Sequence, residues 1–167
     1  DDLGLLRLEG LRVLELGAGT GVLAVASAQL GAEVIATEQE ERLKLLQKNV
    51  ERHAVSNDDG RVQIGRRGGS VDVQELDWFS PGAVPECDLV LATDVVYTEE
   101  VTLALVRCLV SIGAPAILSV ELRTEEVHSV FVEALAQARF SVHRLPASLI
   151  AESVRTPRVV TYALLPP

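Results

Sequence analysis

The stretch RVLELGAGTG, residues 12–21, decides how this sequence folds. Residues 12–16 form a short apolar run typical of a β-strand, and the Ala- and Val-rich residues 22–30 after the glycines predict a helix. Glycines between a strand and a helix allow a tight turn and let a ligand approach main-chain N–H groups. A dinucleotide loop of the form G-x-G-x-x-G would need glycine at Val22, and a P-loop would need Gly-Lys-Ser/Thr. The pattern is instead acid-x-Gly-x-Gly-x-Gly from Glu15, which favours a functional loop over a plain turn.

The rest of the chain alternates short apolar runs with helical periods. Further strands are predicted at residues 33–38, 71–78, 88–93, 116–120, 141–145 and 159–164, and helices at 40–53 and after Thr98 and Thr124. Residues 56–70 predict a polar, Gly-rich connection with room for a short hairpin around 62–64. The alternation in 71–78 predicts an edge strand, whereas the continuous apolar run at 88–93 predicts a central parallel strand. The fold class is therefore α/β, with a mostly parallel sheet covered on both faces and an antiparallel pair at the C-terminus.

Length and composition restrict the function further. The 167 residues fit a single domain, 1–167, and a hydrophobic content of 48% is enough for a substantial core. A net charge of −9 argues against binding to nucleic acid or an anionic membrane and favours a basic protein surface as partner. The longest uncharged stretch, 16–32, is interrupted by four glycines and is not a transmembrane span. Two cysteines fit a reducing compartment, and the absence of methionine predicts a fragment that lacks an N-terminal extension.

Carboxylates gather at the predicted carboxyl ends of the strands, where doubly wound sheets bind ligands. Glu38 lies 17 positions after Gly21, where it either accepts hydrogen bonds from two ribose hydroxyls or serves as an acid at a helix N-terminus. Asp77 and Trp78 suit an adenine, through a hydrogen bond and ring packing, although Trp78 could instead cap a hydrophobic edge.

Four motifs, in order, resemble the family 16 protein-lysine methyltransferases of the methyltransferase-like 21 and 22 type. They are ELGAGTG at 15–21, the acid Glu38, LDW at 76–78 and DVVY at 94–97. The resemblance covers residues 10–125 and implies a class I, Rossmann-like, doubly wound sheet of seven strands that binds S-adenosylmethionine. The family commonly has a further cofactor-contacting tryptophan upstream of the glycine loop, and this sequence has none there.

The resemblance also implies roles for individual residues. Gly17, Ala18 and Gly19 would line the methionine and ribose end of the cofactor, with Glu15 supporting the loop. Glu38 would hold the ribose, Trp78 would pack on the adenine, and Thr93 would contact the cofactor. Together with the assignments made from the residues themselves, the expected cofactor-binding set is Glu15, Gly17, Ala18, Gly19, Gly21, Glu38, Asp77, Trp78 and Thr93.

The expected catalytic residues are Asp94 and Tyr97. Asp94 would lie nearest the transferring methyl and the incoming lysine, and we expect it to capture and orient that lysine rather than act as a strong base. Tyr97 either walls the lysine channel or simply packs. Glu121 and Arg123 follow a strand end and either contact substrate or form a surface ion pair.

The sequence therefore predicts a methyltransferase that acts on a lysine of another protein. The alternatives are a nicotinamide-dependent oxidoreductase and a methyltransferase-like binding module without strong activity. The three histidines lack the spacing of a metal site, so no metal is expected. We expect a monomer in the cytoplasm or nucleus.

Overall fold

The computed structural model describes residues 6–58 and 61–167. The strands are β1 (Arg12–Leu16), β2 (Glu33–Glu38), β3 (Ala54–Asp58), β4 (Arg61–Ile64), β5 (Gly69–Glu75), β6 (Leu89–Thr93), β7 (Ala116–Glu121), β8 (Ser141–Arg144) and β9 (Val159–Leu165). The helices are α1 (Val22–Gln29), α2 (Glu40–Glu51), α3 (Glu99–Ile112) and α4 (Glu125–Gln137), with short 3₁₀ turns at Ala147–Leu149 and Glu152–Val154. Within the described residues, no helix has the length and apolar character needed to cross a membrane.

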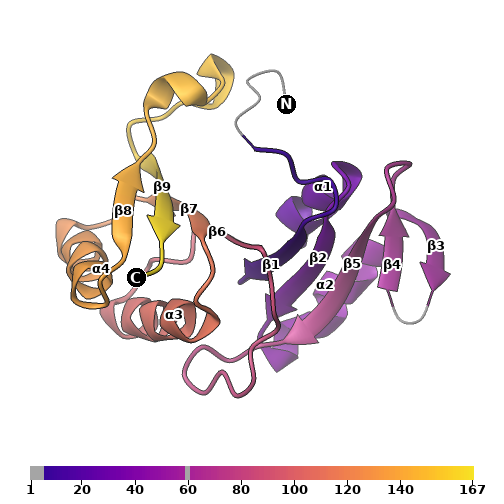
Figure 1. Cartoon of the computed structure of the whole chain (residues 1–167), viewed down its shortest axis with the longest axis horizontal. Coiled ribbons are helices and arrows are strands. Elements are labelled where there is room, and N and C mark those ends of the chain that lie inside the picture. Colours follow the sequence, from indigo (N-terminus) through magenta and orange to yellow (C-terminus); the bar gives the residue numbers. More distant parts are fainter. Residues whose placement is uncertain (1–5, 59–60) are drawn as a thin grey trace.

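The described strands form one sheet in the order β3-β4-β5-β2-β1-β6-β7-β9-β8 (Figure 1). The five central strands, β5-β2-β1-β6-β7, run parallel to one another, and β9 runs antiparallel to both β7 and β8. This confirms the α/β class, the central parallel position of 88–93 and the antiparallel pairing at the C-terminus. The carboxyl ends of β1, β2, β5 and β6 consequently share one edge of the sheet.

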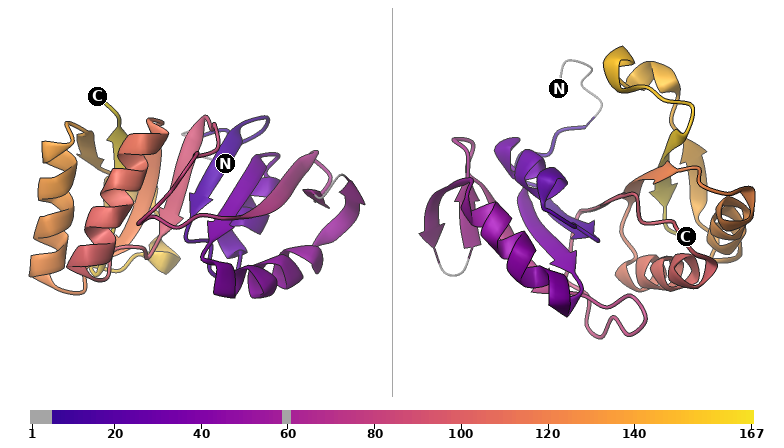
Figure 2. Two further views of the ribbon diagram at one scale, coloured as in Figure 1. Left: turned by 90° about the horizontal axis from the view of Figure 1, so that it is seen from below. Right: turned by 180° about the vertical axis from the view of Figure 1, so that it is seen from behind.

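Two hydrophobic cores lie on the opposite faces of this sheet. Alternate residues of β1 divide between them, because Val13 packs with α1 and α2 while Leu14 and Leu16 pack with α3 and α4. Seen from behind in Figure 2, α1 and α2 lie in front of the strands, and α3 and α4 form a separate pair beside the other half of the sheet. The sheet is therefore doubly wound, as expected.

The sheet differs from the expectation at its β3 edge. Residues 71–78 were expected to form an edge strand, but β5 pairs with β2 on one side and with β4 on the other. The hairpin β3-β4 begins at Ala54, before the expected connection 56–70, and its residues 59 and 60 lie outside the described residues. It brings the described sheet to nine strands instead of seven. The alternation in β5 therefore reflects one helix-covered face and one more polar face, where the Gln74 amide donates to Asp72. It does not mark an edge.

Both predicted helix starts are confirmed. The Thr98 hydroxyl accepts a hydrogen bond from the Val101 N–H, and the Thr124 hydroxyl accepts one from the Val127 N–H, each at 3.3 Å. Two glutamates follow each threonine in the first turn, where negative charge stabilises the helix N-terminus. These starts place the first turns of α3 and α4 at the edge where the strands end.

Candidate active site

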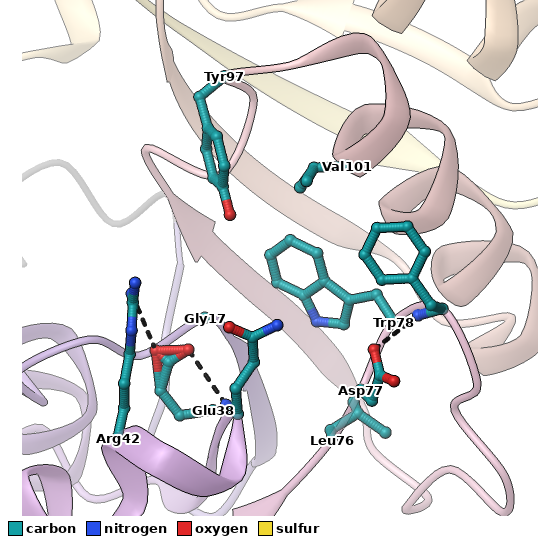
Figure 3. Close-up of a pocket in the computed structure, with 10 residues that line it drawn as sticks. Gly17, Glu38, Arg42, Leu76, Asp77, Trp78, Tyr97 and Val101 are labelled. Atoms are coloured by element: carbon teal, nitrogen blue, oxygen red, sulfur yellow. Dashed lines mark hydrogen bonds and ion pairs between the residues drawn. The ribbon is translucent and has the colours of Figure 1, made fainter.

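A pocket of about 400 Å³, including its open mouth, lies at the carboxyl edge of the sheet (Figure 3). Its walls come from the ends of β1, β2 and β5 and from the first turns of α2 and α3. The lining residues are Gly17, Glu38, Gln39, Arg42, Leu76, Asp77, Trp78, Phe79, Tyr97 and Val101. Five residues of the expected site therefore meet in one cavity. They are Gly17, Glu38, Asp77, Trp78 and Tyr97.

Glu38 supplies a buried carboxylate to this pocket. It is the last residue of β2, and only 7% of its surface is exposed. One carboxylate oxygen accepts a hydrogen bond from the Gln39 N–H at 3.2 Å, and the other lies 3.9 Å from the Arg42 guanidinium one helical turn later. Figure 3 shows this group on one side of the pocket and Trp78 on the other. The carboxylate is held in a fixed place and has capacity for further donors.

Gly17 lets the glycine loop pack directly against Trp78. Its φ of +67° is unfavourable for other residues, and a Cβ there would lie 3.1 Å from both Trp78 Cζ2 and Val95 Cγ1. The indole therefore rests on the loop backbone, and a side chain at position 17 would push it away. The loop and the aromatic wall of the pocket are built as one unit.

The other residues of the glycine loop either fix its backbone or leave space beside it. The buried Ala18 donates its N–H to the Thr37 carbonyl at 2.9 Å, which ties the loop to β2. Gly21 precedes α1 with a φ of +86°, and a Cβ there would lie 2.8 Å from Leu46. Gly19 also has a positive φ, +56°, but a Cβ there would meet nothing within 4 Å. The space beside Gly19 is thus open to a ligand.

Glu15 lies beneath the loop with 2% of its surface exposed. Its pKa is raised to about 8: burial raises it most, a hydrogen bond from the Ala24 backbone lowers it, and the negative charge of Glu38 raises it. Oε2 of Glu15 has no hydrogen-bond partner among the described residues. A buried, unsatisfied carboxyl at this point is costly for the protein alone, and such a group commonly marks a functional site.

Asp94 follows β6 immediately and has a left-handed backbone, with φ at +55°. Its N–H donates to the Ser119 carbonyl, and its two carboxylate oxygens accept from Nη2 of Arg123 at 2.9 and 2.8 Å. Asp94 does not line the pocket, but the next residue, Val95, packs against Gly17. Tyr97, three residues on, directs its hydroxyl into the pocket in Figure 3. Thr93, the exposed last residue of β6, precedes Asp94.

Two pocket residues at the start of α2 were not predicted from the sequence. Gln39 and Arg42 belong to the start of α2, and the spacing of Arg42 four residues after Glu38 was the available signal. Phe79 lines the wall beyond Trp78, and its N–H donates to an Asp77 carboxylate oxygen at 2.9 Å. Asp77 thus fixes the turn that presents both aromatic rings, and its second oxygen has no hydrogen bond within the described residues.

A family model described as lysine methyltransferase matches residues 1–138. The chain belongs to the lysine methyltransferase family. Within this family, protein N-lysine methyltransferase METTL21A of Danio rerio is 33% identical over 147 residues, covering 86% of this chain and 64% of that protein. METTL21A of Mus musculus is 35% identical over 99 residues, covering 59% of this chain and 43% of that protein. The chain spans less than two thirds of the length of these relatives.

Solved structures of methyltransferases share the fold of this lysine methyltransferase family member. Magnesium protoporphyrin IX methyltransferase of Synechocystis PCC 6803, solved with bound S-adenosylmethionine, superposes with a TM-score of 0.69 at 21% identity, covering 96% of this chain and 72% of that structure. A putative RNA methyltransferase of Pyrococcus horikoshii gives 0.66 at 21% identity, covering 95% and 76%. These likenesses confirm the Rossmann-like methyltransferase fold, and the family match confirms the resemblance found in the motifs.

Proposed function

We propose that this chain binds S-adenosylmethionine and transfers its methyl group to a lysine side chain of another protein. The observation that carries the proposal is the meeting of Gly17, Glu38 and Trp78 in one pocket, beside Asp94, in a member of the lysine methyltransferase family. Family membership favours this reaction over that of a nicotinamide-dependent oxidoreductase.

The residues present fit this cofactor. Trp78 offers an aromatic face for adenine and Glu38 offers buried carboxylate oxygens for two ribose hydroxyls, while Asp77 has a free oxygen for a donor. The open space beside Gly19 suits the methionine end of the molecule. Glu15, Ala18 and Gly21 would hold the loop, and Thr93 would add a contact at the end of β6. The two buried carboxyl groups, those of Glu15 and Glu38, also suit a ligand that carries positive charge.

S-adenosylmethionine supplies an electrophilic methyl group attached to a positively charged sulfur. The amine nitrogen of the lysine forms the new N–C bond, the methyl–sulfur bond breaks with its electron pair left on sulfur, and a proton leaves the amine to water. Because this is an in-line displacement, holding the amine in line supplies much of the rate. A lysine near pH 7.4 is neutral in only about one molecule in a thousand, so the site must also favour the neutral amine.

Asp94 is the residue that we assign to the amine. Its strained backbone directs a carboxylate to the sheet edge at the point where Val95 meets the glycine loop. From there it would accept a hydrogen bond from the lysine and orient its lone pair. Tyr97, which lines the pocket from the same loop, would form a wall of the lysine channel.

The test compares Asp94→Ala with the unchanged chain, using a protein extract and methyl-tritiated S-adenosylmethionine. Labelling of the substrate band, identified by mass spectrometry, should fall by about a hundredfold or more, because orientation of the amine is lost. Cofactor affinity measured by calorimetry should change little. Normal labelling by Asp94→Ala would contradict the role of Asp94. A chain that binds the cofactor tightly but labels nothing would support the binding module instead.

The chemistry of the surface suggests what kind of protein is modified. The net charge is −9, and the first turns of α3 and α4, at the edge that holds the site, carry Glu99, Glu100, Glu125 and Glu126. We therefore infer a substrate whose lysine lies on a basic surface. A location in the cytoplasm or nucleus, a single-domain organisation and a monomeric state stay predictions. Both cysteines, Cys87 and Cys108, are free thiols.

A further inference from the structure

The carboxylate assigned to the substrate amine is already paired with a cation. Nη2 of Arg123 donates to both carboxylate oxygens of Asp94, at 2.9 and 2.8 Å, and lies 3.5 Å from Glu121. Glu121 in turn pairs with Arg158 at 3.1 Å. The four side chains form a row of alternating charge along the carboxyl edge of β6 and β7.

The backbone of the sheet holds both members of the pair in place. Asp94 N–H donates to the Ser119 carbonyl on β7 at 2.9 Å, which fixes the start of its side chain. Arg123 follows β7 by two residues, and the intervening Leu122 donates its N–H to the Arg158 carbonyl at 2.7 Å. The register of β6, β7 and β9 therefore brings Arg123 to Asp94, and the contact does not depend on a loose surface loop.

The pairing resolves a conflict in the proposed chemistry. A carboxylate alone stabilises the protonated form of a nearby lysine, but methyl transfer needs the neutral amine. Arginine keeps its charge at any pH at which the protein is folded, and Asp94 raises the pKa of Arg123 still further. A carboxylate that shares its charge with a permanent cation retains lone pairs for a hydrogen bond, while its pull on an ammonium is largely cancelled.

We propose that Arg123 is a positioning residue for methyl transfer. It holds the Asp94 carboxylate in place and offsets its charge, so that Asp94 accepts a hydrogen bond from the substrate amine without stabilising the protonated amine. This inference rests on the proposed function, and it deepens the role assigned there to Asp94.

Other titratable groups near the pair have to be separated from the substrate amine. Glu121 ends β7, Arg158 precedes β9, Glu125 and Glu126 begin α4, and Tyr97 follows Asp94 in the same loop. Tyr97 is the one of these groups that carries a hydroxyl, so each profile is also measured in a Tyr97→Phe background. A midpoint that this replacement leaves unchanged belongs to the amine.

The experiment measures methyl labelling of the extract band at pH values from 7 to 10. Only the labelling that is lost in Asp94→Ala is counted. Arg123→Gln removes the charge, Arg123→Lys keeps a charge, and Arg158→Gln is the matched control. Arg158 pairs with Glu121 in the same row and makes no hydrogen bond or ion pair with Asp94 among the described residues. Calorimetry and thermal unfolding verify that each variant binds cofactor and folds, which the half-exposed position of Arg123 should permit.

For Arg123→Gln we expect labelling three- to tenfold slower at pH 7.5, with the gap closing above pH 9. The midpoint of the profile should rise by roughly 0.5 to 1 pH unit, the effect expected of a partly exposed unit charge about 6 Å away. Arg123→Lys should recover most of the wild-type midpoint, and Arg158→Gln should keep it.

Two results would overturn this inference alone: equal midpoints for Arg123→Gln and Arg158→Gln, or faster labelling by Arg123→Gln at pH 7.5. The second would mean that Arg123 occupies the place of the amine and blocks it. If instead Asp94→Ala labels every band as strongly as the unchanged chain does, the proposed function fails, and the role of Arg123 fails with it. The Asp94→Ala control thus distinguishes the two failures.

Discussion

Replacing Glu15 with glutamine should stabilise the chain at alkaline pH. Glu15 is 2% exposed, Oε2 has no partner among the described residues, and burial raises its pKa to about 8 from an ordinary value of 4.5. Between these two pH values the folded chain retains a proton that the unfolded chain has lost. The free energy of unfolding therefore decreases as the pH rises from about 4.5, and the loss is complete above about 8.

The size of the effect follows from the same two pKa values. At about 1.36 kcal/mol per pH unit, the part of the loss that falls between pH 5.5 and 9 is at most about 3 kcal/mol. Glutamine has nearly the shape of the protonated acid and carries no charge at any pH. Relative to the unchanged chain, Glu15→Gln should therefore become more stable by up to about 3 kcal/mol over this range.

Urea unfolding at pH 5.5 and pH 9 measures this difference directly. Other groups contribute equally in both proteins, so the difference between their two free energies of unfolding isolates the contribution of Glu15. Glu133→Gln on α4 is the matched control, because this exposed glutamate loses the same charge and has no ion pair in the described part of the chain. The free energies of unfolding of Glu15→Gln and of the unchanged chain are compared at each pH. If their difference is the same at pH 5.5 and pH 9 to within about 0.5 kcal/mol, the reasoning is refuted.

Two further predictions concern the expected cofactor-binding residues. Gly19→Ala should lower cofactor affinity by tenfold or more, because its methyl group enters the open space beside the loop, whereas Gly82→Ala should leave it unchanged. Both glycines have a similar positive φ and no neighbour within 4 Å of a Cβ, so urea unfolding should show the same loss of about 1 kcal/mol for each. Glu38→Gln should lower cofactor affinity measured by calorimetry by about ten- to a hundredfold, as expected for a lost charge-assisted hydrogen bond. Glu40→Gln, two residues later and exposed, should not; equal losses for the two would contradict the ribose assignment.

The fold was largely predictable because the strands of a parallel sheet are continuous apolar runs. β6 has such a sequence, β1 and β2 have apolar residues at most positions, and the glycine loop and the two threonine caps mark where helices begin. The hairpin β3-β4 was less visible because its residues are polar, and its pairing with β5 depends on contacts between distant segments. The same cause explains the wrong edge assignment for residues 71–78: alternation reports which face is covered and carries no information about lateral neighbours.

The candidate site could be predicted where its residues lie at strand ends, because the topology alone gathers such residues at one edge. Gly17, Glu38 and Trp78 meet in the pocket for this reason. The link between Asp94 and Arg123 could not be chosen from the sequence, which left a substrate contact and a surface ion pair equally open. It depends on a left-handed backbone at Asp94, a non-glycine residue, and on the register of β7 with β9.

Glu15 and Glu38 together connect the stability of the chain to its proposed ligand. Glu15 lies one residue before the end of β1 and Glu38 ends the adjacent β2, and the negative charge of Glu38 adds to the burial that raises the pKa of Glu15. A bound sulfonium beside them would act in the opposite direction and favour the ionised acid. The free energy that the empty site loses at alkaline pH would then be recovered on binding, since the ligand supplies the positive charge that the fold does not. A site that is unfavourable when empty and compensated when filled selects for a cationic nucleoside over a neutral one of the same shape.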